Sequence, residues 1–367
     1  MRANISRKTI SPGSRIRVLV VDDSVVIRRL VTHALSEDTG LEVVGVAANG
    51  SIALERIAHL NPDVITLDIE MPGMDGLALL RRLKDSPQRP RVVMFSTLTD
   101  RGAAMTLESL ALGADDYVAK AANVGSLDRS MASLRTELIP KIRQFFLLPG
   151  ETAAVRQPAV APQPALFRPA TTRISRQPKV VAIGVSTGGP TALGAIIPQF
   201  PSDFPLPILI VQHMPPLFTR FLAERLQAVS RLQVTEAAQG TRVRTGVVLI
   251  APGDYHMRVR RNGEETVIQL DQSAPENSCR PSVDVLFRSV GEVYGAAAVS
   301  AVLTGMGQDG LRGAEALRSQ EAYVIAQDEA TSVVWGMPGA VAQAGLANCI
   351  LPLDAVVPEL VRLVGRG

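Results

Sequence analysis

The chain has 367 residues, too many for one ordinary hydrophobic core, so two domains are expected. Hydrophobic residues make up 46% and charged residues 20%, a globular mixture that excludes a disordered chain and a membrane protein. The net charge of +3 comes from scattered basic residues without interleaved aromatics, so nucleic-acid binding is not expected. Direct membrane insertion is not expected either, because no apolar stretch approaches the roughly 20 residues that span a bilayer. The segment from Met1 to Ser14 is polar and lacks the apolar core of a signal peptide, which favours a cytoplasmic location.

The first domain is predicted over residues 15–140, where short apolar runs alternate with amphipathic stretches. This is the pattern of βα units around a parallel sheet. A helix is predicted over 25–35 behind Ser24, a typical N-cap residue. We expect a doubly wound (βα)5 domain with strand order 2-1-3-4-5. Its strands are predicted at 18–21, 43–47, 64–67, 92–95 and 117–118.

Acidic residues follow two of these strands. Asp22 and Asp23 come after the first strand, and Asp68 ends the third. Strands one and three are neighbours in the expected order, so the carboxylates converge at the switch-point crevice, where oxygen ligands suit Mg²⁺. Ser96 and Lys120, one of only five lysines in the chain, follow strands four and five and should face the same crevice. Any one of these acids could equally cap a helix, but the set together predicts a magnesium site.

A linker is predicted at 141–177, because residues 147–178 are rich in Pro, Ala, Gln and Arg and show little periodicity. A second βα series follows and places the second domain at 178–367. We expect an α/β domain with a mostly parallel, Rossmann-like sheet. Its strands are predicted at 180–185, 208–211, 247–250, 299–303 and 323–326.

A candidate nucleophile, Ser186, stands at the turn after the first strand of this domain. Gly184, Ser186 and Gly188 have the GxSxG spacing of a nucleophile elbow, in which small neighbours permit a sharp turn. A glycine-rich turn before a helix can also bind a phosphate through its backbone N–H groups. The turn contains neither GxxxxGK[ST] nor GxGxxG. On this segment alone, a hydrolase and a nucleotide-binding protein remain equally open.

A serine nucleophile needs a base, and the chain has four histidines. His33 and His59 fall on predicted helices of the first domain. His213 directly follows the strand 208–211 and should therefore lie at the same sheet edge as Ser186. His256, in a turn, is the reserve candidate.

The base must be oriented by a third group, usually a carboxylate. Asp309 lies beyond the strand 299–303, in a loop whose glycines let the backbone approach a substrate and donate to an oxyanion. Asp254 and Asp284 could compete for this role. The order Ser, His, Asp differs from the order Ser, Asp, His of the α/β-hydrolase fold, so we do not expect that fold.

The two cysteines, Cys279 and Cys349, have no CxxC spacing. By themselves they cannot build a zinc site or a disulfide framework. We expect both to be ordinary packing residues, in keeping with the frequent burial of free cysteine.

The first domain resembles the receiver domain of two-component response regulators. The resemblance rests on VVDDS, TLDIEMPGMDG, FST and YVAK and covers roughly residues 15–140. It implies that Asp68 is the phosphoacceptor. One departure is Ala121, where receivers usually carry a proline. The resemblance also implies that Mg²⁺ is held by Asp23, Asp68 and the backbone carbonyl of Glu70, that Asp22 acts through water, and that Ser96 and Lys120 contact the phosphoryl group.

The second domain resembles the chemotaxis protein-glutamate methylesterases of the CheB family. Its motifs are IGVSTGGP, VQHMPPLFT, APGDYHM, RPSVDVLF, LTGMGQDG and WGMPGAV, over about residues 178–365. The resemblance implies a nucleophilic Ser186, a general base and acid at His213 and an orienting carboxylate at Asp309. It further implies oxyanion stabilisation by Thr187 and the backbone N–H of Met306.

This family resemblance also implies the reaction and the partners. Glutamyl methyl esters of methyl-accepting chemotaxis receptors would be hydrolysed to glutamate and methanol, and receptor glutamines would be deamidated. The phosphodonor would be the histidine kinase CheA, with Mg²⁺ required in the receiver and no cofactor in the esterase step. Two alternatives stay open from the residues themselves: an output domain that binds nucleotide or protein without catalysis, and a DNA-binding output, for which no helix-turn-helix candidate follows the linker.

Overall fold

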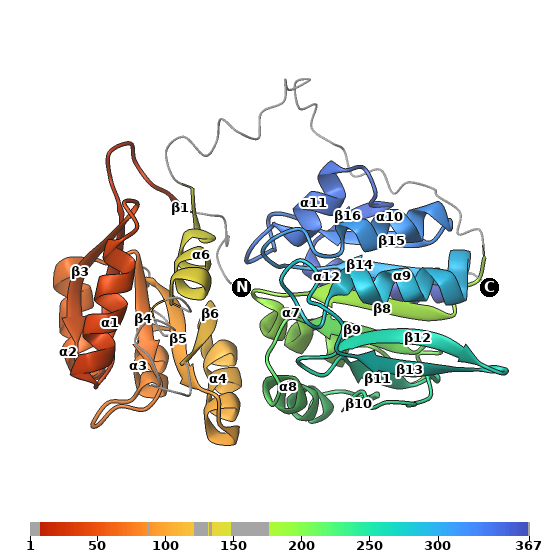
Figure 1. Cartoon of the computed structure of the whole chain (residues 1–367), viewed down its shortest axis with the longest axis horizontal. Helices are drawn as coiled ribbons and strands as arrows, with labels where there is room; N and C mark the ends of the chain where they lie inside the picture. Colours follow the sequence, from red (N-terminus) through yellow and green to blue (C-terminus); the bar gives the residue numbers. More distant parts are fainter. Residues whose placement is uncertain are drawn as a thin grey trace. The chain divides into compact units, whose positions relative to one another are not determined.

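The computed structural model describes residues 8–84, 86, 89–120, 131, 134–147 and 176–365 (Figure 1). These residues form two compact units, one ending at residue 147 and one beginning at residue 176. Each unit contains its own parallel sheet, which confirms the α/β class predicted for both halves. In the part of the chain that the structure describes, no helix is long and apolar enough to cross a membrane.

The first unit is a five-stranded parallel sheet with strand order β3-β2-β4-β5-β6. This is the predicted order 2-1-3-4-5, and all five predicted strands are present. The strands are β2 (Ile16–Val21), β3 (Leu41–Ala47), β4 (Val64–Asp68), β5 (Arg91–Thr97) and β6 (Asp116–Lys120). The described helices are α1 (Val25–Ser36), α2 (Gly50–Leu60), α3 (Gly76–Leu83), α4 (Asp100–Leu112) and α6 (Ile139–Arg143), with a π-helical turn at Leu134–Leu138.

Side-chain caps determine where the first helices begin. Ser24 caps α1 as predicted, because its hydroxyl accepts a hydrogen bond from the Ile27 N–H at 3.4 Å. Asn49 and Asp75 cap α2 and α3 in the same way. Such caps satisfy backbone donors that have no partner within the helix. Each helix therefore starts close to the carboxyl end of the strand before it.

A short strand pair extends the first unit beyond the predicted range. β1 (Lys8–Thr9) pairs with β7 (Phe146–Leu147), and α6 continues to residue 143, although the linker was predicted to begin at 141. Phe145 and Phe146 are fully buried, so the chain up to here belongs to the packed unit. Most of the predicted linker lies outside the described residues. The domain limits 15–140 and 178–367 stay a prediction.

The second unit is a seven-stranded parallel sheet with strand order β10-β11-β9-β8-β14-β15-β16. All five predicted strands are present, but the short edge strands β10 (Gln233–Glu236) and β16 (Cys349–Leu351) were not predicted. β8 has β9 on one side and β14 on the other, which makes its carboxyl end a switch point where a crevice opens. The predicted strands are β8 (Val180–Val185), β9 (Ile208–Gln212), β11 (Val247–Ile250), β14 (Ala298–Val302) and β15 (Tyr323–Gln327).

An antiparallel hairpin interrupts the parallel pattern of this unit and was also not predicted. It consists of β12 (His256–Asn262) and β13 (Glu265–Asp271), and it packs against α9. The helices of the second unit are α7 (Gly189–Ile196), α8 (Phe218–Gln227), α9 (Val283–Tyr294), α10 (Leu311–Ser319), α11 (Met337–Gln343) and α12 (Leu353–Val364), with 3₁₀ turns at Ile197–Gln199 and Gly295–Ala297.

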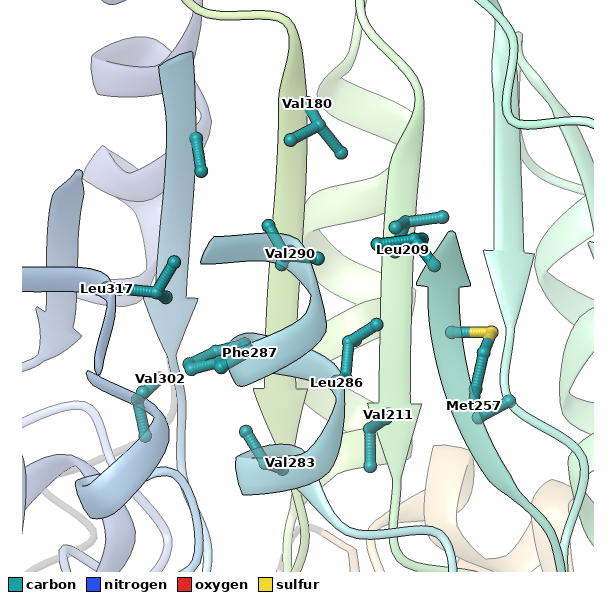
Figure 2. Packing of buried hydrophobic residues seen from close by; sticks show 14 of the residues in the cluster. Val180, Leu209, Val211, Met257, Val283, Leu286, Phe287, Val290, Val302 and Leu317 are labelled. Carbon is teal, nitrogen blue, oxygen red and sulfur yellow. The ribbon is translucent and has the colours of Figure 1, made fainter. Parts of the chain in front are cut away.

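The core of the second unit is centred on α9. Val283, Leu286, Phe287 and Val290 recur at positions i, i+3, i+4 and i+7 and form one apolar face, and all four are fully buried. Figure 2 shows this face against side chains of the central strands, such as Val302 of β14. This packing holds the first turn of α9 rigidly beside the carboxyl ends of β8, β9 and β14.

Candidate active site and acidic pocket

Three predicted residues of the second domain follow three neighbouring strands. Ser186 directly follows β8, His213 directly follows β9, and Asp309 lies in the loop after β14. The backbone joins the three segments: the His213 N–H donates to the Val185 carbonyl at 3.2 Å, and the Ser186 N–H donates to the Thr304 carbonyl at 3.0 Å. Because parallel strands end at one edge, the three side chains share the crevice of the switch point.

The contact between His213 and Asp309 determines which imidazole nitrogen can act as a base. Nε2 of His213 lies 2.7 Å from Oδ2 of Asp309, and both side chains are largely buried. An ionised carboxylate can only accept, so Nε2 carries a proton. The lone pair of the neutral ring therefore lies on Nδ1.

Asp309 is held by the N-terminus of α9. Its Oδ1 accepts from the Ser282 hydroxyl at 2.8 Å and the Asn277 amide at 2.9 Å, and its Oδ2 accepts from the Val283 N–H at 2.7 Å. Helix N-termini stabilise anions through their unpaired N–H groups. Burial raises the pKa of Asp309, but the hydrogen bond from His213 and these backbone donors outweigh it and hold the pKa below its ordinary value. The carboxylate is therefore charged and fixed in orientation.

The pKa of His213 is shifted upward by its partners. Burial by itself lowers this pKa, but the hydrogen bonds with Asp309 and Cys279 outweigh burial and raise it above the ordinary value of histidine. The imidazole is consequently a stronger base than a free histidine, and a proton that it accepts is stabilised by the buried carboxylate.

Nδ1 of His213 faces a residue that sequence reasoning did not select. Sγ of Cys279, which was expected to be an ordinary packing residue, lies 3.6 Å from Nδ1. The side chains of Ser186, His213 and Cys279 are all partly exposed. Within the described part of the chain, the Ser186 hydroxyl makes no hydrogen bond. Nucleophile–base contacts are often open in proteins without substrate, so this geometry is compatible with a catalytic pair.

The turn around Ser186 depends on two glycines. Gly188 has φ of +77°, a backbone conformation that side-chain-bearing residues rarely adopt. Gly305 packs against the serine so closely that a Cβ there would lie 2.8 Å from the Ser186 Cβ. Of the two predicted oxyanion residues, Thr187 is buried, whereas the Met306 side chain is 41% exposed. The loop after β14 therefore lies directly beside Ser186.

The competing candidates have other partners. His256 is fully buried, with Nδ1 accepting from the Ser282 N–H at 3.2 Å and Nε2 lying 3.1 Å from the Ala274 carbonyl, so neither nitrogen is available as a base. Asp254 pairs with Arg280. Asp284 accepts from the N–H groups of two glycines after β14, at 2.6 and 2.9 Å. None of the three competes for the place of His213 or Asp309.

The hydrogen-bonding environment of Asp309 was not foreseeable in full. Ser282 and Val283 start a strongly periodic helix, and that signal could have located an anion-binding helix terminus. Asn277, which donates to both Asp284 and Asp309, stands in an irregular loop without a recognisable motif. It could be found only once the fold had brought the segments together.

In the first unit, three predicted residues form an acidic pocket with a lysine. Nζ of Lys120 lies 2.8 Å from Oδ1 of Asp68 and 3.0 Å from Oδ2 of Asp22. The ligand oxygens of Asp22, Asp23 and Asp68 lie within 4.8 Å of one another. The strand order thus brings these four residues together at one edge, as the sequence predicted.

The charges of this pocket leave room for a cation. Burial and the neighbouring Asp22 outweigh the opposite effect of Lys120 and together raise the pKa of Asp68 to about 6. Oδ2 of Asp22 is buried and lies 3.0 Å from Nζ of Lys120, an ammonium that it shares with Asp68. Three carboxylates beside one ammonium form a site that suits a hard cation such as Mg²⁺.

Two other predicted residues of this pocket have side-chain partners elsewhere. The Ser96 hydroxyl donates to the Gly102 carbonyl at 3.1 Å and accepts from the Thr106 hydroxyl at 2.6 Å, so it is directed toward α4. The Glu70 side chain pairs with Arg101 at 3.0 Å, and the role of the Glu70 backbone carbonyl as a Mg²⁺ ligand stays a prediction. Ala121, whose departure from the receiver pattern was noted, lies outside the described residues.

The two folds and the groups at their sheet edges define a response regulator that carries a hydrolase as its output domain. Residues 18–132 match the response regulator receiver domain, and residues 181–360 match the CheB methylesterase domain. The chain belongs to the CheB methylesterase family.

Relatives in this family match almost the whole chain. A protein-glutamate methylesterase/protein-glutamine glutaminase of Trichodesmium erythraeum is 48% identical, over 96% of this chain and 99% of its own length. One from a Nocardioides species is 50% identical, over 97% of this chain and 96% of its own length. The solved CheB methylesterase catalytic domain of Thermotoga maritima is 43% identical with a TM-score of 0.51, and the match covers 52% of this chain and all of that domain.

Proposed function

We propose that the chain is a phosphorylation-regulated protein-glutamate methylesterase that also deamidates receptor glutamines. Its substrates are the methylated glutamates of methyl-accepting chemotaxis receptors, and its place is the cytoplasm. The names of the relatives support the activity. The observation that carries the assignment of residues is the 2.7 Å contact between Asp309 and His213, which places the lone pair of the neutral ring on Nδ1, at the sheet edge where Ser186 lies.

The proposed reaction is an acyl transfer in two halves. The Ser186 Oγ attacks the side-chain carbonyl carbon of the glutamyl ester while its proton passes to Nδ1 of His213. The imidazolium then gives this proton to the leaving oxygen, or to the leaving nitrogen when the substrate is glutamine, and methanol or ammonia departs as its bond to the acyl carbon breaks. A water molecule, deprotonated by the same nitrogen, attacks the acyl carbon, and the proton passes to the Ser186 Oγ as glutamate leaves. Asp309 stays ionised throughout and stabilises the imidazolium.

The developing oxyanion needs donors at the same edge. We assign this role to Thr187 and to the backbone N–H of Met306. Thr187 directly follows the nucleophile. Gly305 packs against Ser186, which supports a position of the following N–H, that of Met306, beside the reacting carbonyl. No cofactor is assigned to this half of the protein.

In the receiver domain, we assign the phosphoacceptor role to Asp68. Asp23, Asp68 and the backbone carbonyl of Glu70 would hold Mg²⁺, with Asp22 acting through water. The ion would neutralise charge on the carboxylates and on the incoming phosphoryl group. Lys120 already lies 2.8 Å from Asp68, and Ser96 would have to leave its contacts with α4 to reach a phosphoryl oxygen. The histidine kinase CheA is the proposed phosphodonor.

Regulation follows from linking the two domains in one chain. The unphosphorylated receiver would restrict access to the Ser186 crevice, and phosphorylation of Asp68 would shift the population toward an accessible state. A coupling free energy of about 1–3 kcal/mol is typical for such a switch and corresponds to a stimulation of roughly 5- to 150-fold.

Methanol release tests this proposal directly. The full chain should release methanol from membranes that contain methylated receptors, and acetyl phosphate with Mg²⁺ should accelerate the release. Ser186→Ala should abolish it and Asp68→Asn should abolish only the acceleration. Activity that persists in Ser186→Ala would refute the assignment of the nucleophile.

A further inference from the structure

The imidazole that serves as base in the proposed function faces a thiol. Sγ of Cys279 lies 3.6 Å from Nδ1 of His213, whose Nε2 contacts Asp309. His213, Cys279 and Asp309 offer ligand atoms that all lie within 4.8 Å of one another. The His213 side chain is 13% exposed and Cys279 is partly exposed, so both residues contact solvent.

The separation of these two atoms matches two ligands of one tetrahedral zinc ion. Zinc binds imidazole nitrogen at about 2.0–2.1 Å and thiolate sulfur at about 2.3 Å, so two such ligands at the tetrahedral angle lie about 3.6 Å apart. The measured distance from Nδ1 to Sγ is 3.6 Å. The separation of the two atoms therefore fits two ligands of one ion.

Asp309 completes the site as the partner of its histidine ligand. All the acceptor positions of this carboxylate are occupied by donors: Oδ2 by His213 and Val283, and Oδ1 by side-chain and backbone groups of its own surroundings. It is therefore not free to bind the ion itself. Zinc-binding histidines usually donate their other ring N–H to a carboxylate, which orients the ring and raises its basicity. The pair of His213 and Asp309 already has this arrangement.

We propose that Cys279 and His213 form a binding site for zinc and similar thiophilic divalent cations, and that an ion bound there switches the esterase off. On binding, the thiol proton is released to solvent, and the thiolate and the Nδ1 lone pair are donated to the metal. Water fills the remaining positions. Since the same lone pair must accept the proton of Ser186, the inhibitory consequence rests on the proposed function, whereas the binding site does not.

Cobalt binding tests the site without reference to activity. The metal-free full chain, held in excess Mg²⁺ to occupy the acidic pocket, is titrated with Co²⁺, whose coordination to a thiolate gives a charge-transfer band that an all-oxygen site cannot give. The parent protein should show this band, and excess Zn²⁺ should displace it. Cys279→Ser should lose the band, whereas Cys349→Ser, the change at the other cysteine, should keep it. Absence of the band from the parent protein, or its persistence in Cys279→Ser, would overturn the proposal.

Inhibition is measured separately, as methanol release at increasing free Zn²⁺, with each variant normalised to its own metal-free rate. Removal of the thiolate ligand in Cys279→Ser should raise the Zn²⁺ concentration for half-inhibition by about tenfold or more. Even substitution of residues that only hydrogen-bond to a metal ligand typically costs about 10- to 100-fold in metal affinity. Equal sensitivity of the parent and Cys279→Ser would contradict the inhibitory role. Ser186→Ala should retain the cobalt band while releasing no methanol. If this variant still released methanol, the proposed function would be refuted, but the proposed metal site would not.

Discussion

The substitution Asp309→Asn tests the orientation of the base most sharply. Oδ1 and Oδ2 of Asp309 both accept hydrogen bonds. An asparagine amide has only one acceptor oxygen, so its NH2 group must replace one of these two acceptors and face groups that also donate. If the amide oxygen stays with Ser282 and Asn277, the NH2 group faces Nε2 of His213. The ring must then accept at Nε2 and carry its proton on Nδ1, which removes the lone pair needed by Ser186.

The expected loss is large because it combines the wrong tautomer with the loss of a buried charge. Comparable substitutions in serine triads lower turnover by about 10⁴, equivalent to about 5.5 kcal/mol of transition-state stabilisation. The N–H of Val283 also loses its acceptor, and an unsatisfied buried donor costs about 1–3 kcal/mol of folding stability. The protein should remain folded but melt at a lower temperature.

The assay is methanol release at saturating methylated receptor, measured below the melting temperature of the variant. Asp284→Asn is the matched control: this buried carboxylate neighbours Asp309 and accepts from Gly310 and Gly313, but it does not contact His213. It should lose stability and far less turnover. A near-normal rate in Asp309→Asn, or equal losses in both variants, would refute the reasoning.

Three further predictions concern the receiver and the serine turn. Asp68→Asn should keep the basal methanol release and lose the stimulation by acetyl phosphate, and a stimulated variant would exclude Asp68 as the phosphoacceptor. Chelation of Mg²⁺ in the parent protein should likewise remove the stimulation and spare the basal rate, whereas loss of both would place a metal in the esterase step. Gly188→Ala should lower the free energy of unfolding by at least about 1 kcal/mol, because φ is +77° and the new Cβ would lie 2.5 Å from a Val333 methyl. Thermal or denaturant unfolding measures this change, and an unchanged stability would contradict it.

Long apolar strands were predictable from the sequence because burial on both faces of a parallel sheet leaves a strong signal. β8 and β11 were predicted with the same limits as those observed. The edge strands β10 and β16 have only a few residues and partly exposed side chains, so they lack that signal. The hairpin β12–β13 has charged residues at exposed positions, and its two-residue turn begins at Gly263, with φ of +62°. A glycine at the start of a two-residue loop is a typical hairpin signal, although no hairpin was predicted here.

The predicted site residues could be placed at sheet edges by strand order, but their contacts could not. Which nitrogen of His213 faces Asp309 depends on the rotation of the ring, and the direction of the Ser96 hydroxyl depends on α4. Cys279 is 66 residues away from His213 in the chain, and it reaches the imidazole only because α9 and the loop before it fold over the strand ends. Such long-range contacts leave no periodic pattern in the sequence.

The central claim is that Ser186 hydrolyses receptor methyl esters under the control of Asp68. Methanol release from methylated receptor membranes, measured for the full chain and for Ser186→Ala with and without acetyl phosphate, tests it most directly. We expect release by the parent protein, faster release with the phosphodonor, and none by Ser186→Ala under either condition. Release by Ser186→Ala at the parental rate, or no release by the parent protein with the phosphodonor present, would contradict these roles of Ser186 and Asp68.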